Sequence, residues 1–155
     1  MKKLFFILSA AFISLNMNAQ KIAADNVPST VTAAFKAKFS IAEKTTWELE
    51  YDNYQADFSV GKSDFSALFD KDGKWLETVT YIKSSDLPKA VKETLAKKYG
   101  EVLSAYKLDD VEKVETEKTT KYTMDVIKGE ETFELEIDDQ GRISKDVIKS
   151  DTKKD

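Results

Sequence analysis

The stretch FDKDGKW, residues 69–75, returns in shortened form as IDDQGRI, residues 137–143. In each copy an aspartate opens a turn, a glycine follows three residues later, and a basic residue leads into a large apolar one. Aspartate can hydrogen-bond to the backbone two residues on, and glycine readily adopts a positive φ angle. We therefore expect two equivalent hairpin turns, DKDG and DDQG, in a chain that uses one structural unit twice.

A helical pattern stands ahead of each turn. Apolar side chains spaced four residues apart form one face of a helix, and two segments show this spacing: residues 25–40, with Val27, Val31, Phe35 and Phe39, and residues 85–100, with Leu87, Val91, Leu95 and Tyr99. Pro28 and Pro88 are expected in the first helical turns, where a missing N–H costs nothing. Asp25 (or Asn26) and Asp86 are the expected caps.

Each helical pattern is followed by segments that alternate apolar and polar residues, as strands with one buried face do. Trp47, Leu49 and Tyr51 are expected on one face, and Trp75, Val79 and Tyr81 likewise share a side. The expected strands are residues 46–51, 53–60, 64–70 and 74–82, then 105–115, 121–127, 132–137 and 142–148. The pattern predicts an α+β protein of two tandem helix-plus-four-strand repeats, with both helices packed on one face of an antiparallel sheet of seven or eight strands.

The start of the chain has the layout of a secretory signal peptide. Lys2 and Lys3 precede an apolar run from Leu4 to Leu15, which is shorter than the roughly 20 residues that cross a bilayer. We expect residues 1–19 to be a signal peptide that directs export to the periplasm or the extracellular space. Residues 20–149 then form one domain, with repeat one at about 25–83, repeat two at about 84–149, and a disordered tail at 150–155.

Charge argues against nucleic acid as a partner. Loss of Lys2 and Lys3 leaves 22 basic against 28 acidic residues, so the net charge moves from −4 to −6. An acidic surface repels phosphate, and no cluster of basic and aromatic residues offsets this. We expect a monomer that has no membrane contact once the signal peptide is removed.

The residues quoted so far resemble those of the PepSY-like family of exported bacterial domains, whose fold is likened to the β-lactamase inhibitor protein. The resemblance covers nearly all of the mature chain. Ile143 replaces Trp75 in the second copy, and no tryptophan there corresponds to Trp47. The resemblance implies a non-catalytic exported binding or inhibitory module, and the matching positions are structural ones: Val27–Pro28, Leu87–Pro88, Trp47, Tyr54, Phe58 and the two turns.

The residues that most catalytic mechanisms require are absent from this sequence. Histidine and cysteine are absent, which excludes Ser–His–Asp and Cys–His catalysis and zinc sites built from imidazole or thiolate. Asp70 and Asp72 begin like a calcium loop, but Lys74 and Tyr81 stand where ligands are needed. We expect no cofactor, no metal and no enzymatic activity. A hydrolase that uses two carboxylates is the remote alternative.

The polar side of the predicted sheet is the candidate site. An acidic strand face can simply be the wetted side of an antiparallel sheet, or it can bind a basic partner by electrostatic complementarity. The favoured hypothesis is recognition of another exported protein, with inhibition of a periplasmic or extracellular hydrolase as its specific form. A carrier or sensor of a small ligand, bound between helix and sheet, is the alternative. The candidate binding residues are Glu48, Glu50, Gln55, Asp57, Trp75, Glu134 and Glu136; for Trp75 a place in the core is the favoured interpretation and contact with a partner is the alternative.

Overall fold

The computed structural model describes residues 20–100 and 106–149. Within these ranges the chain forms two α-helices and one antiparallel sheet of nine strands, in the order β1 to β9. The α+β class and the antiparallel sheet are thus confirmed, with one strand more than the sequence predicted. The predicted signal peptide (1–19) and the predicted tail (150–155) lie outside the described residues, as do residues 101–105.

Every strand is hydrogen-bonded to the strand that follows it in the chain, so the sheet is a continuous meander. Helix α1 lies in the connection from β1 to β2, and α2 in the connection from β5 to β6. The bounds in chain order are β1 Gln20–Ile22, α1 Ser29–Lys38, β2 Glu43–Glu50, β3 Asn53–Val60, β4 Ser63–Phe69, β5 Trp75–Tyr81, α2 Lys89–Tyr99, β6 Lys107–Glu115, β7 Thr120–Lys128, β8 Glu131–Asp138 and β9 Ile143–Ile148.

Both helices begin just after their proline, later than predicted. Pro28 and Pro88 occupy the N-cap positions, and neither cap has a side-chain hydrogen bond. Asp25 and Asp86 instead belong to short 3₁₀ turns, η1 (Ala24–Asn26) and η2 (Ser84–Asp86), so the prediction that they cap the helices was wrong. The physical reason is that proline disfavours helical geometry in the residue before it.

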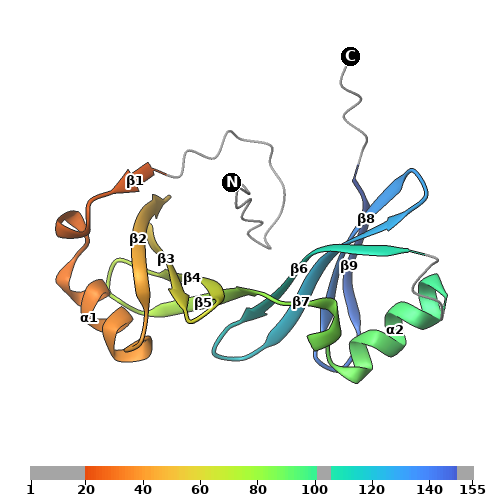
Figure 1. The fold of residues 1–155 in the computed structure, drawn as a ribbon. Coiled ribbons are helices and arrows are strands. Elements are labelled where there is room, and N and C mark those ends of the chain that lie inside the picture. Colours follow the sequence, from red (N-terminus) through yellow and green to blue (C-terminus); the bar gives the residue numbers. More distant parts are fainter. Residues whose placement is uncertain (1–19, 101–105, 150–155) are drawn as a thin grey trace, which may run out of the picture.

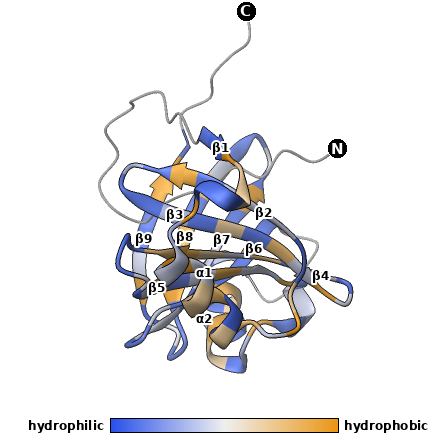
Figure 2. Cartoon of the chain, turned by 90° about the vertical axis from the view of Figure 1, so that its left-hand side faces the viewer, coloured by the Kyte–Doolittle hydropathy of each residue, from blue (hydrophilic) through white to orange (hydrophobic). Residues whose placement is uncertain are grey.

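The helices lie on the same face of the sheet (Figure 1). Phe35 of α1 packs against Trp47 and Phe58, while Leu95 of α2 belongs to a second cluster with Met124. Ala67, Thr78 and Glu115 pair with one another across β4, β5 and β6, so their side chains lie on the same face of the sheet. The pairing of β6 with β7 places Tyr122 and Met124 on this face as well, so both clusters lie on one side of the sheet. Figure 2 shows the same chain from the side, coloured by hydropathy. The sheet curls away from the helices, so the opposite face is the inner side of the curl (Figure 1).

The two glycine turns hold the helices against the sheet. The side chain of Asp70 accepts hydrogen bonds from the backbone N–H groups of Asp72 and Lys74, both at 2.9 Å. Asp138 does the same for Gln140 and Arg142, at 3.0 and 2.8 Å. These bonds, led by that from the Arg142 backbone, lower the pKa of Asp138.

The glycine of each turn has the positive φ angle that the sequence predicts, +84° at Gly73 and +85° at Gly141. A Cβ atom at Gly73 would lie 2.7 Å from the carbonyl oxygen of Thr30, and one at Gly141 would lie 2.7 Å from that of Ala90. Thr30 and Ala90 are the second residues of their helices. The turns therefore touch the helices at points where only glycine fits.

Two predicted side-chain orientations were wrong. Tyr51 does not continue the buried face of β2, because it lies in the β2–β3 turn with a positive φ angle of 54° and is 68% exposed. Trp75 does not share a side with Val79 and Tyr81. A β-bulge between Leu68 and Phe69 shifts the register, so Trp75 pairs with Phe69 on the helix side.

We expect the substitution Gly73→Ala to lower the free energy of unfolding by about 3 kcal/mol, since it combines an unfavourable φ angle with overlap on the Thr30 carbonyl. Gly61→Ala is the matched control. Gly61 also has a positive φ angle, +62°, but no atom lies within 4 Å of its Cβ position, so only the backbone term of about 1–2 kcal/mol applies. Urea unfolding measures both values, and equal losses would show that the turn does not press on the helix.

Candidate functional site

The sheet face opposite α1 and α2, here called the helix-free face, carries most of the predicted binding residues. Residues paired across neighbouring strands point to the same side, and the pairings place polar side chains along this face in cross-strand rows. One row is Lys21, Glu48, Gln55, Leu68 and Glu77, across β1 to β5. Another is Tyr81, Glu112, Thr123, Glu136 and Lys145, across β5 to β9.

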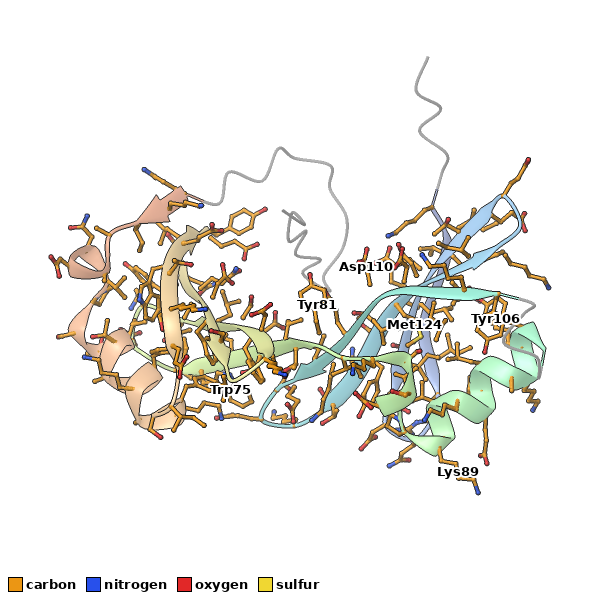
Figure 3. All side chains as sticks on the ribbon, in the orientation of Figure 1. Trp75, Tyr81, Lys89, Tyr106, Asp110 and Met124 are labelled. Carbon is orange, nitrogen blue, oxygen red and sulfur yellow. The ribbon has the colours of Figure 1, made fainter. Side chains whose placement is uncertain are left out.

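Six of the seven predicted residues lie on the helix-free face, and Trp75 does not. Trp75 packs against the core under α1, its ring nitrogen donates to the Thr78 hydroxyl at 2.9 Å, and the Lys38 ammonium lies 3.6 Å from its ring centroid. Figure 3 shows Trp75 on the helix side of β5, whereas Tyr81 and Asp110 point the other way. The six residues on the helix-free face are Glu48, Glu50, Gln55, Asp57, Glu134 and Glu136.

In the second half of this face, described lysines neutralise the carboxylates. Lys145 lies 2.8 Å from Glu134, and Lys121 lies 2.7 Å from Glu136, which the Ser144 hydroxyl also contacts. Lys149 forms a third pair of this kind, 2.5 Å from Asp125. These carboxylates are partnered within the chain, so they are poorly available to anything else.

Glu112 is held by neutral donors instead. The Thr123 hydroxyl donates to it at 3.0 Å, and the Tyr81 hydroxyl also bonds to it. Burial is the largest influence on this group and raises the pKa of Glu112 despite those bonds. Burial and the Glu112 charge raise the pKa of Tyr81. Tyr81 and Glu112 lie opposite each other at the centre of the sheet, where β5 pairs with β6.

The first half differs, because its carboxylates have no such cations. Asp57 accepts hydrogen bonds from Gln55 at 2.9 Å and from Ser66 at 2.5 Å, both neutral. Among the described residues, no lysine or arginine lies within 4 Å of the carboxylates of this half, Glu48, Glu50, Asp57 and Glu77. Negative charge is thus left without ion pairs at this end of the face, where Lys21 acts on Glu48 only at longer range.

Glu50 is the most unusual member of this group. It is only 5% exposed, and its Oε1 atom has no hydrogen-bond partner among the described residues. Burial, and then the Glu48 charge, raises the pKa of Glu50. Burial and the Glu50 charge raise that of Glu77. The pKa of Glu48 is raised by burial and by Asp57, against the opposing effect of Lys21.

The described acids of this face are spread out along it rather than grouped around one point. In the part of the chain that the structure describes, no three acidic side chains are grouped so that they could hold a metal ion. What the first half offers is negative charge and free acceptor atoms, set beside buried apolar side chains such as Leu68 and Val79. Such a surface accepts hydrogen bonds from donors and attracts cations.

A separate cavity of about 470 Å³ lies beside α2. Apolar side chains form most of its wall, and the Lys92 ammonium at its edge donates to the Ser85 carbonyl at 2.6 Å. The lining residues are Ser84, Ser85, Leu87, Lys92, Leu95, Ala96, Tyr106 and Leu108. The sequence analysis expected a small-ligand site, if there was one, between helix and sheet, and this cavity has that position.

Several residues of the face escaped sequence reasoning. Strand β1, with Lys21, was not predicted, since three residues give too short a pattern to recognise. Glu77 interrupts an apolar segment of β5, and that interruption was the available signal. Glu112 was hidden by the β-bulge between Asp109 and Glu112, which breaks the alternation of β6.

These features define an α+β protein whose two helices cover one face of a meandering sheet and leave the other face polar. The sequence model of the family described as "Putative beta-lactamase-inhibitor-like, PepSY-like" matches residues 3–59 and 52–145. The chain therefore belongs to this PepSY-like family, and the resemblance noted in its sequence is confirmed. No curated protein is similar enough in sequence to count as a relative.

Solved structures of Bacteroides proteins share the fold. A DUF2874 family protein from Bacteroides ovatus is 22% identical with a TM-score of 0.72, over 84% of this chain and 93% of that one. A BLIP-like protein from Bacteroides fragilis is 26% identical with a TM-score of 0.67, over 82% and 91%. A Bacteroides eggerthii structure of "putative periplasmic proteins" is 20% identical with a TM-score of 0.70, over 79% and 88%. Neither described helix of this chain is long and apolar enough to cross a membrane.

The raised pKa values predict how stability depends on pH. In the folded protein Glu50 binds its proton more tightly than an unfolded glutamate, whose pKa is near 4.5. The folded state is therefore favoured as the pH falls toward that value, and stability declines as the pH rises through the raised pKa. We expect Glu50→Gln to raise the urea midpoint at pH 7, and the gain to shrink toward pH 4.

Glu93→Gln is the control, because Glu93 is an exposed acid on α2 whose ion pair with Lys89 is a surface contact. Its urea midpoint is expected to stay within experimental error of wild type at both pH values. A Glu50→Gln protein less stable than wild type at pH 7 would mean that the buried carboxylate has a stabilising partner.

Proposed function

We propose that this chain is an exported, non-catalytic protein-binding module that contacts its partner through the helix-free face. The observation that carries this proposal is the uncompensated negative charge on the first half of that face, around the buried Glu50. The periplasmic description of the Bacteroides eggerthii protein and the family's likeness to a β-lactamase inhibitor support export and binding. Inhibition of an exported hydrolase, by covering its cleft, is the specific form we propose.

We further propose that the scaffold arose by duplication of one helix-plus-four-strand unit. Three correspondences support this. Each helix follows a 3₁₀ turn and a proline. β-Bulges interrupt β2 and β6 near positive-φ residues, Lys44 and Asp110. Gly73 and Gly141 touch the same position of their helices. Superposition of the two halves in a crystal structure tests the idea directly.

The binding proposal is tested by charge reversal on the helix-free face. The double variant Glu48→Lys/Glu77→Lys should still fold, because both side chains are only half-buried and the change relieves their repulsion from Asp57 and Glu50. Immobilised wild-type protein is expected to capture a discrete partner from the envelope fraction of the native cell, and the variant is expected to lose at least about tenfold of that capture. Quantitative mass spectrometry of the bound proteins measures the loss.

The matched control is Asp72→Lys/Glu93→Lys, which changes the net charge equally at exposed sites away from the face. It should capture the partner as wild type does. Equal losses of capture in both double variants would show that the effect comes from net charge alone. Unchanged capture by the variant of the helix-free face would refute this face as the binding surface.

A small-ligand carrier is the second candidate, and the cavity beside α2 favours it. Its volume of about 470 Å³ falls within the range of small-molecule sites, and apolar walls with one cation at the rim suit an amphipathic anion. The fluorescent anion 1-anilinonaphthalene-8-sulfonate is a suitable probe. If the cavity is a binding site, Ala96→Phe fills it and abolishes binding to the folded protein, whereas Ala34→Phe on α1 leaves binding unchanged. Loss in both variants, or in neither, would argue against the site.

A further inference from the structure

We propose that the carboxylates of Glu48, Glu50 and Glu77 form a subsite that receives an arginine side chain of the bound protein. The inference rests on the proposed function and specifies the chemistry of the partner. It starts from Glu50, a residue that is only 5% exposed and whose buried Oε1 atom has no described hydrogen-bond partner. A buried acceptor left in this state is unfavourable, and a buried charge is more so.

The surroundings of Glu50 show that the missing partner is a cation. Glu48 precedes it by two residues on the same side of β2, and Glu77 of β5 lies close enough to be influenced by its charge. Lys21, opposite Glu48, is the described cation that acts on this group, and it acts on Glu48 from the edge strand β1. Glu50 is thus influenced by the charge of Glu48, and Glu77 by that of Glu50, on a part of the face where the described chain supplies little positive charge.

The second half of the face provides the comparison within the same molecule. There Glu134 and Glu136 lie on the same helix-free face, on β8, and each has a lysine within 3 Å. In the second half, two of the buried carboxylates of this face thus lie beside a cationic side chain. In the first half a partner's side chain would supply the positive charge that Lys121 and Lys145 supply in the second.

Glu48 and Glu50 lie on β2 and Glu77 lies on β5, and this separation selects the type of cation. A small divalent ion needs several oxygen ligands around one point, and the described acids are not grouped in that way. Lysine's ammonium, which partners the equally buried Glu136 in the second half, is a compact point charge that pairs with one carboxylate at a time. A guanidinium is less hydrated, is always charged, and has five N–H donors that can bridge separated carboxylates. Arginine is thus the side chain that this subsite fits.

The test uses N-acetyl-arginine amide as the probe and N-acetyl-citrulline amide as its neutral isostere. Both are titrated into the purified protein while the side-chain carboxyl signals of the glutamates are followed by ¹³C NMR. We expect saturable shifts of Glu48, Glu50 and Glu77 with the arginine probe, and none with citrulline. Glu50→Gln should weaken the arginine probe about tenfold, while Glu93→Gln leaves it unchanged.

Three results would overturn the inference. They are equal binding of arginine and citrulline, equal binding of N-acetyl-lysine amide, and shifts of these glutamates with calcium chloride but not with arginine. Glu77→Gln is a second variant that makes the same prediction if Glu50→Gln does not fold. If the arginine probe fails while capture of the envelope partner still depends on Glu48 and Glu77, the subsite is refuted and the proposed function stands. If capture of the envelope partner does not depend on Glu48 and Glu77 either, both the arginine subsite and the proposed function are refuted.

Discussion

The close contact between each glycine turn and the start of its helix fixes the geometry of this protein. Gly73 and Gly141 bring a backbone turn so near the helix that a Cβ atom would overlap a helix carbonyl. A turn that tight sets where the helix lies along the sheet, and therefore which apolar side chains meet. Both contacts are made on the same side, so the other side of a nine-stranded sheet is left without a helical cover (Figure 1).

That uncovered side is polar and yet largely buried, because side chains on the inner side of a curled sheet converge. A polar group removed from water needs a partner. The second half meets this need with lysines, as between Glu134 and Lys145. The first half meets it for Asp57 with Gln55 and Ser66, but Glu50 is left with an acceptor that the described chain does not satisfy.

The sequence contained enough to predict the class, the two helices and eight of the strands, because long periodic segments carry that information locally. It placed Glu50 on the correct face, since alternation along β2 is regular up to the turn. It misplaced Trp75, since a β-bulge inverts alternation without changing composition. The burial of individual polar side chains could not be predicted from the sequence either. Whether Glu50 is solvated or enclosed depends on the curl of the sheet and on side chains from other strands.

The difference between the two halves explains how one architecture can serve both stability and binding. Ion pairs within the chain, such as Lys121 with Glu136, satisfy the buried carboxylates of the second half without a binding partner. Uncompensated carboxylates in the first half instead raise the free energy of the unbound protein, and an arriving cation recovers part of it. A partner that supplies a guanidinium gains the attraction of charges already held in place by the sheet. Binding strength would then come from carboxylates that lack a cationic partner in the unbound protein. Because the sheet already holds these carboxylates in place, recognition at this face requires no flexible loop.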